Sequence, residues 1–361
     1  MDGSESQGTR SFSRFPFDCL LFAAFPAFIL LAVMVVAYRD GVLGFDFMHF
    51  NLPAARAVAA GNSPYPAYEY PPLVAFALVP LTFVPGPNIV FAAILIACVP
   101  ASLWFLGVRD WRCYGAVFLW APVLAAVQAS NVTIPLLLGT SICWYARDRW
   151  KPVALAGGLT VAAKLLTAPL VVWLVATRRI AASIGVAVVA AGVSAVLWAV
   201  IGFSGAADYP ANISSIARSS AAQSYTLKVV LEDVGVGAGL ARAAWALVAL
   251  LVVAAAALLG WRGDDRRSFA LAVTAMIVAV PVVWLHSFAL LIAPIAVMRP
   301  RLGAAWLVPI LMIIGPGTGN GAPWQTAGML ALMAVTLGLA LTPRRDRRTG
   351  QTPSEVAVSS H

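Results

Sequence analysis

The residue best placed for chemistry in this chain is Asp46, a carboxylate that follows closely on the first apolar segment. It lies in an aromatic run at residues 44–50, ahead of two proline-rich and aromatic stretches, Gly61-Asn62-Ser63-Pro64-Tyr65-Pro66 and Tyr70-Pro71-Pro72. Proline fixes its own backbone torsion, so such stretches hold nearby side chains in place. A carboxylate held in this way can accept a proton from a hydroxyl group, which is the task of a general base. The pattern predicts chemistry at a membrane face on a lipid-linked substrate.

Other polar residues lie near the ends of apolar segments. Gln128 and Asn131 flank one predicted turn, Lys164 lies in another, and His286 ends the run Pro281-Val282-Val283-Trp284-Leu285-His286. A lysine within an apolar stretch costs about 2.5–3.5 kcal/mol on insertion scales, so an anionic partner or a wet cavity is expected beside it. A phosphate is the partner that we favour.

The elements that position these residues follow from composition. Apolar residues make up 61% of the chain and charged residues only 11%, against roughly 45–50% and about 25% in soluble domains. A helix needs about 20 apolar residues to cross a hydrocarbon core of about 30 Å, and such runs recur from residue 15 to residue 341. We therefore expect an all-α integral membrane protein, with residues 1–342 forming one polytopic domain and residues 343–361 forming a disordered cytoplasmic tail.

Basic residues predict how the spans are oriented, because lysine and arginine in short loops favour the cytoplasmic side. The basic clusters, from Arg10 and Arg14 to the arginines at 344–348, all lie on that side if each interval between them crosses an even number of times. This predicts about twelve spans in the plasma membrane, several of them short or broken, with both termini cytoplasmic. The expected spans are 17–37, 88–107, 113–127, 131–146, 152–163, 166–177, 180–202, 239–260, 268–281, 285–298, 303–317 and 325–342.

Two polar loops then remain on the outer side, at residues 38–87 and 203–238. In the first, residues 51–60 read as a short helix with Pro53 in its first turn and Gly61-Asn62 as its end. Residues 73–84 read as a short apolar segment at the membrane interface. We expect the two loops to face each other across one mouth.

Charge and cysteine content exclude some partners. The net charge of +9 comes largely from dispersed inner-loop residues, which orient the chain and attract anionic membrane lipids, so no nucleic-acid partner is expected. The four cysteines show no metal-ligand spacing, and the chain has no Asp-x-Asp sequence or histidine cluster. We expect neither a metal nor a cofactor.

Four stretches occur in a fixed order over residues 38–300, and each carries part of one pattern. They are Asp46-Phe47 with the alanine-rich segment, Gly61-x-x-Pro64-Tyr65 and Tyr70-Pro71-Pro72; Ala156-Gly157-Gly158 through Lys164 to Pro169; Gln223-Ser224; and Pro281-x-x-Trp284-x-His286. Together they resemble glycosyltransferase family 87, the polyprenyl-phosphate-sugar-dependent transferases of the GT-C class. The chain departs from that pattern at Ala222 and Val280, where the family shows asparagine and serine, at Phe50, where a tyrosine is common, and at Pro169, which comes late.

The resemblance implies a GT-C-like fold and an inverting transfer on the outer membrane face. The sugar, mannose being favoured over arabinofuranose, would pass from polyprenyl monophosphate to a hydroxyl of a glycolipid or lipoglycan. Asp46 is the expected general base. The expected ligands of the donor phosphate are Lys164, His286, Gln223 and Ser224, and the further candidates for substrate binding are His49, Tyr65, Glu69, Tyr70, Gln128, Asn131 and Trp284.

Each assignment has a structural alternative. Asp46 would then cap the helix that follows it or be a solvated loop acid, Lys164 would extend to the membrane interface, and His286 would be a packing residue. His49 and Glu69 would support the loop, and the tyrosines and Trp284 would form an interfacial aromatic belt. At the level of the whole protein, the alternatives are a transporter or flippase, whose spans are also often short or broken, and an inactive accessory subunit.

Overall fold

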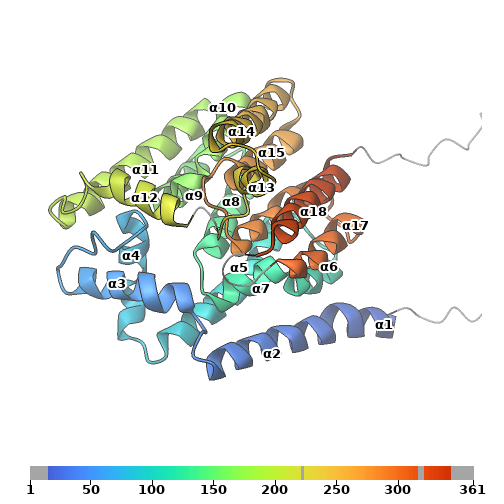
Figure 1. Ribbon diagram of the computed structural model, residues 1–361, viewed down its shortest axis with the longest axis horizontal. Coiled ribbons are helices and arrows are strands. Elements are labelled where there is room, and N and C mark those ends of the chain that lie inside the picture. The colour runs from blue at the N-terminus through green and yellow to red at the C-terminus, as the bar shows by residue number, and fades with distance from the viewer. Residues whose placement is uncertain (1–14, 221–222, 316–320, 343–361) are drawn as a thin grey trace, which may run out of the picture.

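The computed structural model describes residues 15–220, 223–315 and 321–342. Every regular element in those ranges is helical, which confirms the all-α prediction (Figure 1). The predicted tail, residues 343–361, and the basic clusters at both ends of the chain lie outside the described residues.

Within the described residues, five helical stretches are long and apolar enough to cross a membrane, and a sixth crossing is obtained if one bent pair of helices is counted as a span. The five are Phe15–Arg39, built from α1 (Phe15–Cys19), the π-helical η1 (Leu20–Ala24) and α2 (Phe25–Arg39), then α5 (Pro87–Phe105), α11 (Ile180–Val200), α14 (Ala238–Trp261) and α18 (Pro323–Leu341). The bent pair is α7 (Ala121–Gln128) and α8 (Thr133–Tyr145), which meet at 115°.

The prediction of about twelve spans is not confirmed, because many of the counted segments fold into helices shorter than a crossing, which needs about 20 residues. Breaks at proline explain part of this. The expected span 113–127 is divided between α6 (Trp111–Ala116), the 3-10 turn η4 (Val117–Leu119) and α7, which begins with Pro122 in its first turn. The remaining short helices are α9 (Trp150–Ala163), η5 (Leu165–Thr167), α10 (Pro169–Ala176), α13 (Leu227–Asp233), α15 (Asp265–Val278), η7 (Leu285–Leu291), α16 (Ile292–Met298), α17 (Ala304–Leu307) and η8 (Val308–Ile314).

The loop helices gather at one end of the molecule, on the left of Figure 1. They are the π-helical η2 (Phe47–Asn51), α3 (Leu52–Ala59), α4 (Pro72–Leu78), η3 (Val79–Phe83) and α12 (Tyr209–Ser219). Pro53 lies in the first turn of α3 and the residues at 73–84 are mostly helical, as the sequence predicts.

Glycine allows α9 and α11 to pack closely along each other, and this is the most extensive helix pair. A Cβ atom on Gly157 would lie 2.7 Å from Val186 Cγ2, and one on Gly158 would lie 2.5 Å from Val189 Cβ. Real Cβ atoms do not approach so closely. The glycines of the Ala156-Gly157-Gly158 stretch therefore serve helix packing, as small residues do in membrane proteins.

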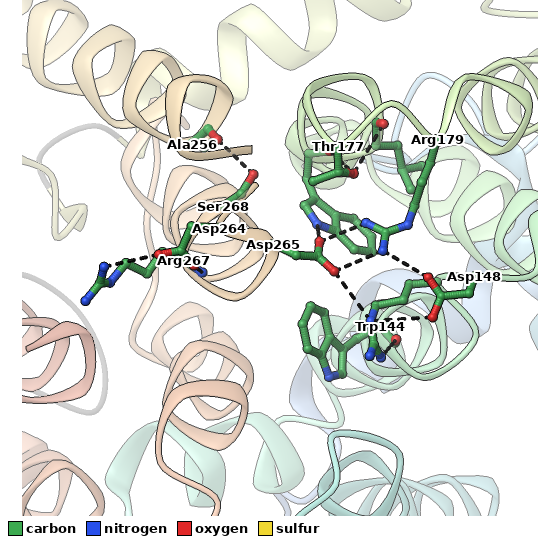
Figure 2. A network of polar contacts seen from close by, with 12 residues as sticks. Trp144, Asp148, Thr177, Arg179, Ala256, Asp264, Asp265, Arg267 and Ser268 are labelled. Atoms are coloured by element: carbon green, nitrogen blue, oxygen red, sulfur yellow. Dashed lines mark hydrogen bonds and ion pairs between the residues drawn. The ribbon is translucent and has the colours of Figure 1, made fainter. Parts of the chain in front are cut away.

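An ion-pair network closes the opposite end of the helix bundle. Arg179, at the start of α11, donates to both carboxylate oxygens of Asp265 over 2.8 and 2.9 Å and to Asp148 over 3.1 Å. Asp265 also accepts from Trp173 Nε1 over 2.7 Å, and Arg147 Nε lies 3.4 Å from it. Figure 2 shows Asp265 projecting from α15 toward Arg179, with Asp148 on the far side of the guanidinium group. The network thus joins α15 to the ends of α8, α10 and α11.

Candidate active site

Asp46 lies at the bend between α7 and α8, and the backbone holds it there. The Gly44 N–H donates to the carbonyl oxygen of Gln128 over 2.7 Å, and the Asp46 N–H donates to that of Ala129 over 3.0 Å. Ser130, in the bend itself, has a φ of +52°, a left-handed conformation that is uncommon outside glycine. Strained backbone of this kind concentrates at functional sites, and here it is set beside the acid that the sequence singles out.

The Asp46 side chain is half-buried and accepts a hydrogen bond from Asn131. Its Oδ2 lies 2.5 Å from Asn131 Nδ2, and it makes no capping bond to the helix that begins after it. The capping alternative for Asp46 is therefore wrong. Burial raises the pKa of this carboxyl above its ordinary value, while the Asn131 hydrogen bond and the charges of Lys164 and His49 act in the opposite direction.

Lys164 lies between α9 and η5, outside the candidate spans, and its charge reaches several site residues. Its Nζ is 5.0 Å from the centroid of the Tyr70 ring, a cation–π contact. It also acts electrostatically on Asp46, Glu69 and His286. Burial lowers the pKa of Lys164 to about 8, and the two carboxylates partly offset this. The ammonium is thus directed toward the site residues.

Glu69 is a second carboxyl near the same ammonium. Burial raises its pKa, the Lys164 charge lowers it, and the neighbouring Asp46 charge raises it further. One cation therefore lies close to two acids that repel each other, which is the arrangement expected where charge has to be stabilised during a reaction.

His286 reaches the site on a segment tied to the second outer loop. The Tyr225 N–H donates to the carbonyl oxygen of Val283 over 2.8 Å, and the Val283 N–H donates to Ser224 Oγ over 2.8 Å. These bonds join the Gln223-Ser224 and Trp284-x-His286 stretches, which lie far apart in sequence. His286 Nε2 is buried and makes no hydrogen bond within the part of the chain that the structure describes. Buried polar atoms normally have a partner, so this nitrogen is available to a ligand.

A cavity of about 560 Å³ brings these residues together. Its polar lining includes most of the predicted site, namely Asp46, Glu69, Tyr70, Gln128, Asn131, Gln223, Trp284 and His286, and it also includes Ser220 and Tyr225. Its apolar lining is Val42, Phe45, Phe50, Ala125, Ala129 and Leu285. A volume of this size suits a small ligand or the head of a larger one.

Four predicted residues are not among those that line the cavity. The Lys164 ammonium contacts the Tyr70 ring, and buried Ser224 makes the backbone bond described above. His49 is exposed and packs against Phe45 in a tilted arrangement, with ring centroids 4.3 Å apart. Tyr65 stacks on Trp198 of α11 at 4.6 Å and donates its hydroxyl to the Tyr70 carbonyl oxygen over 2.7 Å.

The two outer loops are in direct contact beside this cavity. The Tyr209 hydroxyl donates to the Glu69 carbonyl oxygen over 3.2 Å, and Asn212 Nδ2 donates to that of Pro66 over 2.7 Å. At Gly205, with a φ of +77°, an added Cβ would lie 2.5 Å from Tyr65 Cβ. Tyr65 and its neighbours therefore fix one loop against the other and hold Glu69 and Tyr70 at the cavity.

Some lining residues were missed by sequence reasoning. Tyr225 directly follows the Gln223-Ser224 pair and Phe45 directly precedes Asp46, so adjacency to a motif was an available signal for both. Phe50 ends the aromatic run at 44–50 and stands where the family pattern has a tyrosine, so it carried a signal too, whereas Ser220 carries none. They lie on the cavity because the helices that hold them fold over it.

The helical membrane fold and this polar cavity at one end of it are typical of an enzyme that acts at a membrane face. The model of glycosyltransferase family 87 matches residues 68–287, which is more than half of the chain. The chain therefore belongs to glycosyltransferase family 87, and the protein is a membrane glycosyltransferase. Asp46, His49 and Tyr65 precede the matched residues. No curated protein and no solved structure matches the chain.

Proposed function

We propose that the protein transfers a sugar, with mannose favoured, from polyprenyl monophosphate to a hydroxyl of a glycolipid or lipoglycan. The observation that carries this proposal is the placement of Asp46 on the wall of a cavity that is also lined by His286, whose Nε2 has no hydrogen-bond partner among the described residues. A base and a site for an anion therefore share one cavity, and the transfer needs both.

In the proposed reaction, the acceptor hydroxyl loses its proton to Asp46 as its oxygen bonds to the anomeric carbon. The bond from that carbon to the donor phosphate oxygen breaks, and attack from the opposite face inverts the configuration. The phosphate leaves with the bonding electrons. Asn131 donates to Asp46 and so fixes the carboxylate in its accepting orientation.

The leaving phosphate needs donors and positive charge that are in place beforehand. Lys164 supplies the charge, and it interacts electrostatically with Asp46 and Glu69. His286 and the exposed Gln223 line the cavity and supply hydrogen-bonding groups. Ser224 supports the proposal indirectly, because its bond to Val283 connects the Gln223 and His286 segments.

The sugar and the acceptor would occupy the rest of the cavity. Trp284 and Tyr70 offer aromatic faces, and Glu69 and Gln128 offer hydrogen-bonding groups for hydroxyls. Val42, Phe45 and Phe50 are exposed apolar residues on the same wall and suit a prenyl or acyl chain. A lipid-linked donor and a lipid-linked acceptor fit a cavity that has both polar and apolar lining residues.

We further propose that the cavity faces the outer side of the plasma membrane and that both termini are cytoplasmic. The support is that α8 begins beside Asn131 and ends beside Arg147, while α9 begins beside Arg149 and ends at Lys164. The cavity and the basic network are therefore at opposite ends of the same helices. Basic loops favour the cytoplasmic side, which leaves the cavity on the outer side.

The test is transfer by the purified full-length protein in liposomes. Radiolabelled polyprenyl-phosphate mannose and polyprenyl-phosphate arabinofuranose are supplied separately with extracted envelope glycolipids. We expect transfer from the mannose donor, loss of transfer in folded Asp46→Asn, and normal transfer in Asp40→Asn, which changes an exposed acid six residues away. Full transfer by Asp46→Asn would remove Asp46 as the base. Movement of the labelled donor across the bilayer without transfer would instead identify a flippase.

A further inference from the structure

Asn131 is held by Thr133 in one orientation. Its Oδ1 accepts two hydrogen bonds, from the Thr133 backbone N–H over 2.9 Å and from the Thr133 hydroxyl over 2.7 Å. Both residues are buried, with 1% and 2% of their surface exposed. The other end of the amide, Nδ2, donates to Asp46 Oδ2 over 2.5 Å. The three residues thus form a continuous hydrogen-bonded chain that ends on the carboxylate.

The direction of these hydrogen bonds determines which protonation form of Asp46 is stabilised. The Thr133 N–H can only donate, so it requires the oxygen of the Asn131 amide to face it, and the hydroxyl reinforces this choice. The amide must then present its NH₂ group to Asp46. A donor facing a carboxyl group stabilises the ionised form, which is the form a base needs. With the opposite orientation, the amide oxygen would face Asp46 and favour a proton on it.

We propose that Thr133 is a positioning residue for Asp46, which acts through Asn131 and keeps the carboxylate ionised in a half-buried site. This inference rests on the proposed role of Asp46 as the base. Thr133 itself is not among the residues that line the cavity, so its effect is transmitted by the amide.

Several charged or titratable groups also face Asp46 from the surrounding elements. His49 comes from η2, Glu69 and Tyr70 from the segment before α4, and Lys164 from the end of α9. None of them forms a hydrogen bond with Thr133 in the described ranges, where the Thr133 side chain bonds to Asn131. A change confined to the Thr133 hydroxyl therefore leaves these groups in place.

The first measurement is the pH dependence of carbodiimide labelling of Asp46, because carbodiimides react with protonated carboxyl groups. The full-length protein in liposomes is labelled with dicyclohexylcarbodiimide, and the Asp46 peptide is quantified by mass spectrometry. We expect Thr133→Val to move the labelling midpoint upward by about half a pH unit. The shift is small because the backbone N–H of residue 133 still donates to Asn131 Oδ1 and partly keeps the amide in its orientation. Thr133→Ser should restore the wild-type midpoint.

The matched control is Thr140→Val on the same helix. Thr140 is fully buried, and its hydroxyl makes no hydrogen bond within the described ranges. This variant should leave the midpoint unchanged. Melting temperatures check that each variant is folded, and Thr133→Ala replaces the valine variant if that one does not fold.

The second measurement separates this inference from the proposed function. In the transfer assay, the acid limb of the pH–rate profile should move upward in Thr133→Val by the same amount as the labelling midpoint, with KM little changed. Shifted labelling in a protein that transfers no sugar supports the positioning role and overturns the proposed function. Asp46-dependent transfer with an unmoved midpoint in folded Thr133→Val overturns the positioning role, as does an equal shift in Thr140→Val.

Discussion

The Lys164 ammonium lies 5.0 Å from the centroid of the Tyr70 ring, and Tyr70 lines the cavity while Lys164 is not among the lining residues. Lys164 therefore contacts the cavity through a residue of its wall. The same cation also interacts electrostatically with Asp46 and Glu69. Lys164 thus acts on the cavity as a fixed source of positive potential.

A first prediction concerns the basic limb of the activity profile. Burial lowers the pKa of Lys164 to about 8, so its ammonium is charged below that pH and lost above it. We expect kcat/KM to fall as pH rises through about 8. In Lys164→Met, kcat/KM should be lower by less than about 100-fold and the limb should disappear, because a donor in direct contact is typically worth 10²–10³ and Lys164 does not line the cavity. A basic limb unchanged in Lys164→Met would assign it to another group. Lys164→Arg serves as the charge-retaining control.

A second prediction concerns the acid limb. Burial raises the pKa of Asp46 above the ordinary 3.8, so transfer should fail as pH drops through that raised value, where the base becomes protonated. Asn131→Asp replaces the donor with a second carboxyl group at hydrogen-bond distance. Two adjacent carboxylates cannot both ionise easily, so the acid limb should move up by about one unit or more. The pH dependence of kcat/KM measures this, and an unmoved limb would show that Asp46 is not the titrating base.

A third prediction concerns the packing of α9 on α11. Gly158→Ala places a Cβ 2.5 Å from Val189 Cβ and 3.1 Å from the Val186 carbonyl oxygen, so the helices have to separate. We expect a loss of about 1–3 kcal/mol in stability, as for other overpacked sites. Gly192→Ala, on α11 itself, meets no atom within 4 Å and should stabilise the helix by about 0.5–1 kcal/mol. Thermal unfolding in detergent compares the two, and equal melting temperatures would contradict the close packing.

A fourth prediction concerns the ion-pair network. Asp265→Asn removes the carboxylate that binds Arg179 through two nitrogens and also accepts from Trp173. Because both partners are largely shielded, we expect a loss of about 1–3 kcal/mol. Asp148 has 75% of its side chain exposed, so Asp148→Asn should cost less than about 1 kcal/mol. Chemical or thermal unfolding distinguishes the two, and the ranking would be wrong if Asp148→Asn proved the more damaging change.

The sequence predicted the positions of the helices better than the number of membrane crossings that they make. The expected segments 88–107 and 180–202 correspond closely to α5 and α11. Hydropathy does not record bends, however, so the sequence predicts separate crossings at 113–127 and 131–146, whereas α7 and α8 are long enough for a crossing only when they are taken together as one bent pair. Their 115° angle depends on Ser130 and on the backbone bonds from residues 44 and 46, which are formed by distant parts of the chain.

The residues of the candidate site were likewise predictable only in part. Charged and polar residues in apolar surroundings, such as Asp46 and His286, were found from their chemistry and lie on one cavity. Roles that depend on hydrogen-bond direction were not found. Ser224 bonds to a backbone N–H, and Asn131 is shared between Thr133 and Asp46. These partners are set by tertiary contacts and leave no periodic trace in the sequence.

The short central helices also bear on how the protein enters the bilayer during synthesis. α8 and α9 contain 13 and 14 residues and span about 20 Å each, less than the hydrocarbon core of about 30 Å. Neither can leave the translocation machinery as a stable solitary span. The longer α5 packs against α8, and the longer α11 packs against α9. We therefore expect α8 and α9 to insert stably only after α11 has been synthesised. Maturation of the catalytic end would then be a late event in biogenesis.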